Sequence, residues 1–327
     1  MHILKGYTKQ EISWMMYDWA NSAHSVIIVT LLPIFFDTVA GYTADSVSSM
    51  STWGYATSIA MLIVALAAPF LGVFGDIRGM RKKLFSFFML LGVAACAGMA
   101  FTPGMDFTSG PVAAGKVATL ILVLYIVSVI GFDASAIYYD AFLTDVTTED
   151  RMDKVSTMGY GLGYIGGSTI PLLIFLIMNL VGVPMLTCLA FVFGLTAVWW
   201  LAFSLPLLKN CEQTSGKPYE KGDVARSIKG VGTTIKEIIA NKPMLIYILS
   251  YFFYIDGVHT VISMATTYGT NLGLDSTGMM LALLLVQILG LPFCLLYIKC
   301  SEKFGARTMV GFGICVYMFI CIFAFFM

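Results

Sequence analysis

Acidic and polar side chains recur at helical spacing inside three long apolar stretches of the sequence. The first stretch holds Asp18, Asn21, Ser22 and Ser25, and the third holds Asp256, His259, Thr260 and Ser263. The second holds Asp133 and Asp140, seven positions apart, with Tyr138 and Tyr139 beside Asp140. Residues three, four or seven positions apart share one face of a helix. Each set therefore predicts a polar stripe that faces a protein interior or a water-filled cavity.

The chemistry open to these stripes is the binding of a polar solute and the transfer of protons. A carboxyl group in an apolar setting can exchange a proton near neutral pH, and His259, one turn from Asp256, is a candidate proton relay. The predicted pathway residues are Asp18, Asn21, Ser25, Asp133, Tyr139, Asp140, Asp256, His259 and Gln287. The alternative is that these side chains only hold helices together through hydrogen bonds.

The bulk composition indicates which elements carry the stripes. Of the 327 residues, 58% are hydrophobic and 12% are charged, against roughly 45–50% and a quarter in soluble domains. A disordered chain and a soluble enzyme are excluded, and the zero net charge gives no indication of a nucleic-acid partner. A membrane-spanning helix needs about 20 mostly apolar residues. The sequence predicts nine: 13–36, 53–75, 84–102, 117–141, 156–180, 185–208, 244–268, 277–299 and 308–327.

The distribution of Lys and Arg predicts the orientation of these helices. With the N-terminus in the cytoplasm, every Lys and Arg of the 19 except Lys116 falls in a cytoplasmic segment. Positive charge is retained on the cytoplasmic side of membrane proteins. We therefore expect a multi-pass protein of the cell membrane with a cytoplasmic N-terminus. The compact loops suggest a bacterial inner membrane.

The longest polar segment divides the chain. Residues 1–208 are expected to form a six-helix bundle, 209–243 a cytoplasmic linker, and 244–327 a partial second bundle of three helices. Within the linker, residues 226–239 alternate apolar and basic side chains at helical spacing. This pattern predicts either a helix on the inner membrane surface or a solvated linker. A weak repeat, Asp76 to Arg81 against Glu302 to Arg307, supports two related halves.

Two glycine-containing segments are candidates for conformational roles. Gly72, Asp76, Gly79 and Arg81 lie in the short loop after the second predicted span, where an acid can meet a helix N-terminus. The alternative is that the basic residues there only set orientation. The glycines of residues 159–167 predict tight helix packing, with a gating hinge as the alternative. No phosphate-binding loop, zinc-protease motif or cysteine metal motif occurs in the sequence, so we expect no cofactor, no metal and no enzyme.

Several motifs of the sequence resemble those of a known family. The first-helix motif Tyr17-Asp18-Trp19-Ala20-Asn21-Ser22-Ala23 is similar to that of the vacuole-effluxer-like family of the major facilitator superfamily, and residues 139–143, 159–167 and 254–258 agree with it. The resemblance runs from about Ile12 to the end of the chain. It implies a carrier of twelve helices in two bundles, of which nine are present, and a contact between Asp76 and the eleventh helix in one carrier state. Because the chain ends inside an apolar run, we expect a truncated reading frame or fragment.

The residues and the resemblance together predict a secondary active transporter. Family members include a vacuolar amino-acid effluxer in fungi, so the expected cargo is a small polar solute such as amino acids, exported by alternating access, with protons as a candidate coupling ion. The expected partners are this solute, protons and the lipid bilayer. The main alternative is a degenerate or truncated membrane protein that transports nothing and serves as a receptor or scaffold. His24, Ile77 and Ile255 depart from the family pattern.

Overall fold

The computed structural model describes residues 4–43, 49–218, 223–271 and 276–326. The chain divides into two compact units, residues 1–221 and residues 222–327. Each unit is all-helical within the described residues apart from one isolated β-bridge, between Ile77 and Lys217. The predicted linker is shared between the units, because residues 209–217 belong to the first unit and the helix that follows belongs to the second.

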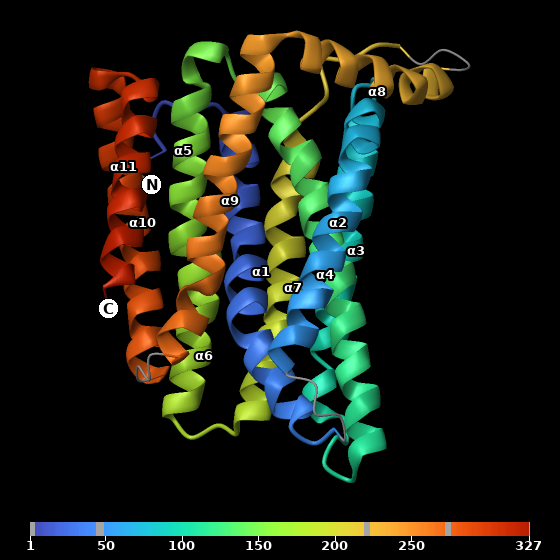
Figure 1. Cartoon of the computed structure of the whole chain (residues 1–327), viewed down its shortest axis with the longest axis vertical. Coiled ribbons are helices and arrows are strands. Elements are labelled where there is room, and N and C mark those ends of the chain that lie inside the picture. The colour runs from blue at the N-terminus through green and yellow to red at the C-terminus, as the bar shows by residue number, and fades with distance from the viewer. Residues whose placement is uncertain (1–3, 44–48, 219–222, 272–275, 327) are drawn as a thin grey trace. The chain divides into compact units, whose positions relative to one another are not determined.

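The described residues of the first unit form seven α-helices (Figure 1). They are α1 (Lys9–Ala40), α2 (Ser49–Gly75), α3 (Arg81–Met99), α4 (Pro111–Val146), α5 (Met152–Gly163), α6 (Ile170–Leu180) and α7 (Met185–Asn210). Short 3-10 turns at Thr102–Gly104 and Glu149–Arg151 precede α4 and α5. A π-helical turn, Tyr164–Thr169, joins α5 to α6, so the predicted span 156–180 is one continuous but uneven helix.

Local sequence accounts for where these helices begin. Thr8 caps α1, because its hydroxyl accepts a hydrogen bond from the Glu11 amide while the Glu11 side chain accepts one from the Thr8 amide. Pro111 stands in the first turn of α4, where a missing amide proton costs nothing. Gly79 turns the chain between α2 and α3 with φ +82°, a conformation that glycine adopts without strain.

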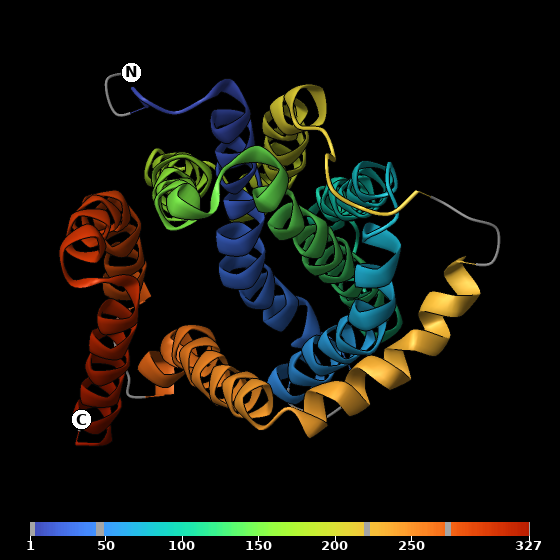
Figure 2. The same ribbon diagram turned by 90° about the horizontal axis from the view of Figure 1, so that it is seen from above.

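α1 is the central helix of the first unit. It packs against α4, α5 and α7, and Figure 2 shows it between them when the helices are viewed end-on. Trp14, Tyr17 and Phe35 of α1 are fully buried, as is Trp200 of α7. The unit's core is therefore built around a helix that carries both large aromatic rings and one of the predicted polar stripes.

The glycine segment 159–167 packs α5 and the π-helical turn tightly against α1. A Cβ atom added at Gly166 would overlap the Trp19 ring, and one added at Gly167 would meet the backbone of Trp19 and Ala23. Only glycine permits such a close approach. This geometry agrees with the packing interpretation of the glycine segment.

Within the ranges 223–271 and 276–326, the second unit forms four helices: α8 (Asp223–Ala240), α9 (Lys242–Asn271), α10 (Ser276–Phe304) and α11 (Ala306–Phe325). α8 covers the predicted amphipathic segment 226–239 and meets α9 at a bend of 97° between Gly230–Ala240 and Lys242–His259. A helix in this part of the linker is thus present, and its position on a membrane surface stays a prediction.

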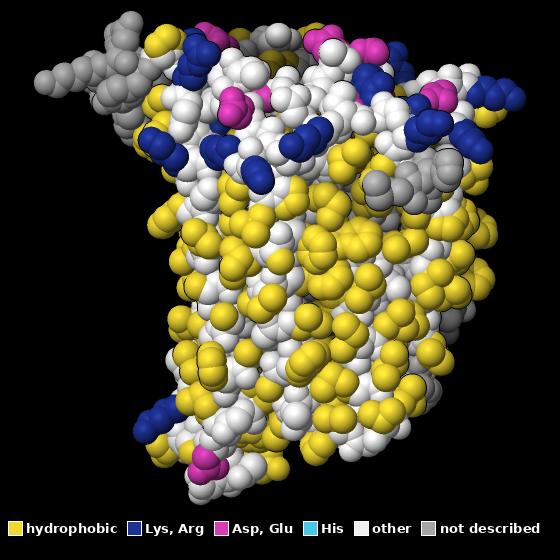
Figure 3. All heavy atoms as spheres, turned by 180° about the vertical axis from the view of Figure 1, so that it is seen from behind, with side chains coloured by type: hydrophobic (Ala, Val, Ile, Leu, Met, Phe, Trp, Pro, Cys, Tyr) yellow, Lys and Arg dark blue, Asp and Glu magenta, His cyan; other side chains and the backbone are white. Residues whose placement is uncertain are grey.

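Eight helical segments of the described residues are long and apolar enough to cross a membrane, or nine if the bent α8–α9 pair counts as one span. Figure 3 shows Lys and Arg side chains gathered at one end of the displayed face, above a broad region of hydrophobic side chains. The prediction of an all-helical, multi-pass membrane protein is confirmed. The predicted spans coincide with α1 to α4, the α5–α6 segment, α7, α9, α10 and α11.

Candidate functional site

The buried centre of the first unit is a carboxylate–tyrosine pair between α1 and α4. The Tyr139 hydroxyl donates a 2.8 Å hydrogen bond to Asp18 Oδ2. Trp14 fixes this tyrosine, because its indole nitrogen donates to the Tyr139 carbonyl at 2.9 Å and its ring stacks on the Tyr139 ring with centroids 4.3 Å apart. Asp18 and Tyr139, both predicted pathway residues, are thus brought together and held from one side by an aromatic wall.

α5 closes a second side of the pair. A Cβ atom at Gly159 would overlap Asp18 Oδ2, and one at Gly163 would overlap the Ser22 hydroxyl. The glycine segment therefore lets the α5 backbone lie directly over the polar stripe of α1. Any larger residue there would displace the Asp18 carboxyl group.

A directed chain of hydrogen bonds lies beside the pair. Ser135 donates to the Phe132 carbonyl at 2.8 Å, so its oxygen accepts the Tyr17 hydroxyl proton at 2.8 Å. Trp200 in turn donates to the Tyr17 oxygen at 3.4 Å. Three helices, α1, α4 and α7, are joined by this chain, which matches the structural role that interhelical hydrogen bonds play in membrane bundles.

His24 lies farther along α1 than Asp18 and is also buried. Ser128 donates to the Tyr125 carbonyl at 2.9 Å, so its hydroxyl oxygen accepts from His24 Nε2 at 3.3 Å. This assigns the proton of a neutral imidazole to Nε2. His24 Nδ1 is then an acceptor, and it has no hydrogen-bond partner within the described residues. The Phe132 ring stacks on the imidazole with centroids 4.7 Å apart.

The other two acids of α4 differ from Asp18 in exposure. Asp140 is exposed, yet it is close enough to Asp18 for the two carboxyl charges to interact. Asp133 is half-buried, and its Oδ2 atom has no hydrogen-bond partner in the described part of the chain. On α1, Asn21 is buried and Ser25 is half-buried. Of the three acids predicted for the pathway in the first unit, Asp18 is therefore paired, while Asp133 and Asp140 are open to a further partner.

The remaining predicted pathway residues belong to the second unit. Asp256 and His259 lie one turn apart on α9, and both are exposed. Gln287 lies near the middle of α10 and is buried. The side chains of Thr260 and Ser263 lie outside the described residues. Whether Asp256, His259 and Gln287 share a pathway with Asp18 stays a prediction.

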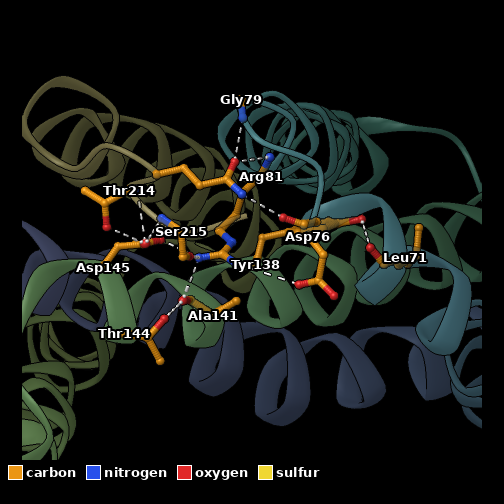
Figure 4. A network of polar contacts seen from close by, with 12 residues as sticks. Leu71, Asp76, Gly79, Arg81, Tyr138, Ala141, Thr144, Asp145, Thr214 and Ser215 are labelled. Carbon is orange, nitrogen blue, oxygen red and sulfur yellow. Dashed lines mark hydrogen bonds and ion pairs between the residues drawn. The ribbon is translucent and has the colours of Figure 1, made fainter. Parts of the chain in front are cut away.

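Three of the four predicted loop residues, Asp76, Gly79 and Arg81, take part in a separate polar network of the first unit (Figure 4). Arg81 is buried, and its guanidinium forms a short ion pair with Asp145 Oδ2 and donates to the Ala141 carbonyl at 3.0 Å. Asp76 Oδ1 is 4.0 Å from Arg81 Nη2, and its side chain is 80% exposed. Gly72 lies in the last turn of α2, where an added Cβ atom would meet open space, and Gly79 makes the turn that follows. The dominant partner of Arg81 is thus Asp145, a residue that the sequence patterns did not single out.

Glu11, at the same end of the unit as this network, is a second acid whose two carboxylate oxygens both accept hydrogen bonds. Glu11 accepts hydrogen bonds from Arg151 Nε and Nη2, both at 2.9 Å, from the Thr147 hydroxyl at 2.7 Å and from the Thr8 amide at 2.7 Å. It ties the start of α1 to the α4–α5 connection. The Thr-x-x-Glu pattern of a capping box at Thr8 and Glu11 was the available sequence signal for this residue.

No group of three or more His, Cys, Asp or Glu side chains among the described residues has the geometry of a metal site. Around Asp18 lie the Tyr139 hydroxyl, which donates to its carboxylate, the Trp14 side chain, which donates to the Tyr139 carbonyl, and the closely packed Gly159. Whether this arrangement holds and releases a polar solute or a proton stays a prediction.

Comparisons with known proteins show the family to which the chain belongs. A family model described as "Vacuole effluxer Atg22 like" matches residues 7–327. A Bacillus subtilis (strain 168) protein described as the uncharacterized MFS-type transporter YxiO is 39% identical over 99% of this chain and 75% of its own. Autophagy-related protein 22-1 of Penicillium rubens is 24% identical over 51% of this chain and 30% of its own length.

A solved structure supports the fold alone. The xylose transporter XylE from E. coli, in a partially occluded inward open conformation, is 13% identical and matches with a TM-score of 0.51 over 91% of this chain and 73% of that one. Both the sequence match and the fold match extend over nearly the whole chain. The chain therefore belongs to the vacuole-effluxer (Atg22-like) family of major facilitator superfamily transporters.

Proposed function

We propose that this transporter is a secondary active carrier that exports a small polar solute, with amino acids as the substrate class, by alternating access and with coupling to protons. The observation that carries the proposal is the set of acids within the membrane-spanning helices of the first unit. Asp18 is paired with Tyr139, while Asp140 is exposed and Asp133 keeps an unpartnered oxygen.

The cost of these groups supports a role in transport. An acid within a membrane helix costs at least about 2.5–3.5 kcal/mol on insertion scales, and Asp133 recovers little of that cost through hydrogen bonds. An exposed carboxylate on a span is a suitable partner for the ammonium group of an amino acid or for a proton. We assign the solute-facing role to Asp140 and the proton-exchanging role to the coupled Asp18–Asp140 pair.

The proposal also includes polar residues of the second unit. Asp256 and His259 on α9 and Gln287 on α10 are proposed pathway residues of that unit, as Asn21, Ser25 and Tyr139 are of the first unit. Gly72, Asp76, Gly79 and Arg81 would control the exchange between carrier states at the cytoplasmic end. The proposed location is the bacterial inner membrane, with the N-terminus in the cytoplasm.

The test uses the purified chain in lipid vesicles with an imposed pH gradient, and a mixture of labelled amino acids as the probe. Asp140→Asn should reduce gradient-driven flux at least tenfold, because amide and carboxyl differ in charge and in proton exchange. Asp106→Asn is the matched control, since Asp106 is exposed and bonds only to the Thr108 and Ser109 segment of its own loop.

Two outcomes would contradict the proposal. If Asp140→Asn and the corresponding Asp256→Asn variant keep full gradient-dependent flux, these carboxylates have no part in coupling. If the unaltered chain is stably folded, carries no solute and retains a bound protein partner, the receptor or scaffold alternative replaces the carrier.

A further inference from the structure

The segment that follows α7 is fastened across the loop between α2 and α3. Residues 211–217, which we call the strap, run beside residues 76–78 with the spacing of a parallel β-bridge. The Arg78 amide donates to the Lys217 carbonyl and the Lys217 amide donates to the Asp76 carbonyl, each at 3.0 Å. Gly216 has φ +112° and lies so close that a Cβ there would be 2.6 Å from the Asp76 carbonyl oxygen.

Gln213 of the strap supplies the cap that α3 lacks. Met80, which precedes the helix, makes no side-chain capping bond. Instead the Gln213 side-chain oxygen accepts from the Gly79 amide at 2.8 Å and from the Arg81 amide at 3.2 Å. Its side-chain nitrogen donates to the Gly75 carbonyl at 3.0 Å. One amide group therefore joins the end of α2 to the start of α3.

Asp145 fastens the other side of the strap to α4. Its Oδ1 atom accepts from the Thr214 amide at 3.1 Å, the Thr214 hydroxyl at 2.9 Å and the Ser215 amide at 2.9 Å. Its Oδ2 atom pairs with Arg81, which also donates to the Ser215 hydroxyl at 3.2 Å. The buried ion pair and the strap thus share one carboxylate, as Figure 4 shows.

We propose that the strap is a latch that holds the α2–α3 loop and the cytoplasmic end of α4 in the state described here, with Gln213 as its positioning residue. The inference rests on the proposed transport cycle only for the claim that the latch must open. Residues 214–217 are exposed, so water can replace their hydrogen bonds and local opening is inexpensive. The chain continues from the strap into the second unit. A movement of the second unit can therefore be transmitted through the strap to the α2–α3 loop.

The first experiment measures amide hydrogen exchange on the full chain in lipid nanodiscs. Gln213→Ala should speed exchange about fivefold, both in peptides covering the strap and in those covering residues 76–81, because a net hydrogen bond contributes about 1 kcal/mol. Glu212→Ala, an exposed neighbour on the same strap, should leave both unchanged. Gln213→Glu keeps the acceptor for Gly79 and Arg81 and should restore part of the protection. If residues 76–81 exchange at the same rate in all variants, the strap does not hold the loop.

The second experiment locks the latch with a disulfide. Paired residues on neighbouring strands lie about 4.8 Å apart, within the range that a disulfide requires, so Ile77→Cys with Lys217→Cys should form one on oxidation. Burial raises the pKa of the native Cys211 thiol to about 12, which keeps it protonated and unreactive beside the new pair.

The locked variant separates a latch from a static brace. Oxidation should abolish solute flux in vesicles and a reductant should restore it, while the two single variants keep flux under both conditions. Full flux with the disulfide formed would show that the strap never opens and would overturn the proposal. If the unaltered chain carries no solute, the proposed function fails, and hydrogen exchange alone decides whether the latch exists.

Discussion

The acids at the Lys- and Arg-rich end of the first unit accept more hydrogen bonds than the acids within its spans. Asp145 and Glu11 each accept hydrogen bonds on both carboxylate oxygens, from an arginine and from backbone or hydroxyl groups. In the spans, Asp18 accepts from Tyr139, and Asp133 retains an oxygen without a partner within the described residues. The two regions lie in the same unit and share α1 and α4.

We infer from this difference that the acids of the first group stabilise the protein. Those within the spans keep the capacity to bind a solute or a proton. A saturated carboxylate has no capacity for a ligand, and removing it leaves a buried arginine without its partner. An unsaturated carboxylate costs stability and is retained only where it meets a solute, a proton or another helix. Substitutions of the acids with fully used oxygens should therefore mainly lower stability. Substitutions of the acids within the spans should mainly lower transport.

The largest stability effect is expected for Asp145→Ala. The Asp145 side chain is completely buried and that of Arg81 is 6% exposed, so the substitution leaves a buried charge unpaired. We expect the free energy of unfolding to fall by about 3–5 kcal/mol, measured by denaturant titration in mixed micelles. Asp76→Ala is the matched control, because Asp76 faces the same arginine from an exposed position, and it should cost less than about 1 kcal/mol. Equal losses would remove the distinction between the two acids.

An intermediate effect is expected for Tyr139→Phe. The substitution removes the hydroxyl that donates to Asp18 and should lower the free energy of unfolding by about 1–3 kcal/mol. Tyr138→Phe removes a 3.0 Å bond to the Leu71 carbonyl from the neighbouring position and should cost about 1 kcal/mol. In vesicles, only Tyr139→Phe should change solute flux. A flux that falls equally in both variants would indicate that general helix packing, and not the Asp18 pair, limits transport.

The smallest stability effect is expected for Asp133→Asn. Because one oxygen of Asp133 has no partner among the described residues, replacing the acid by an amide should change the free energy of unfolding by less than about 1 kcal/mol, in either direction. Gradient-driven flux should fall nevertheless. A loss of stability as large as that of Asp145→Ala would show that Asp133 is a structural residue, and the comparison between the two regions would no longer hold.

The spans were predictable because a membrane helix carries its own signal. Each needs about 20 apolar residues with all backbone hydrogen bonds made inside the segment, and the observed helices follow the predicted ranges. The pairing of Asp18 with Tyr139 was not predictable from spacing. The two residues lie on different helices, and their contact depends on how closely the glycines of α5 let it approach α1.

The role of the strap residues could not be predicted from sequence patterns either. Gln213, Thr214 and Ser215 stand in a short polar segment of ordinary linker composition, and Asp145 stands near the end of a span, where an acid is unremarkable. They become informative only when folding places residues some 60 to 140 positions apart in contact. Ile77, noted as a departure from the family pattern, is the buried partner of Lys217 in the β-bridge.

The sequence by itself determined the membrane class, the approximate positions of the spans and the family, because hydropathy and short motifs are properties of contiguous residues. It also identified the acids whose presence in apolar helices requires a reason. Only the tertiary structure decided which of those acids are paired and which are open, since hydrogen bonding and burial depend on groups brought together from distant helices. The same physical reason explains why Asp145, and not the motif residue Asp76, is the main partner of Arg81.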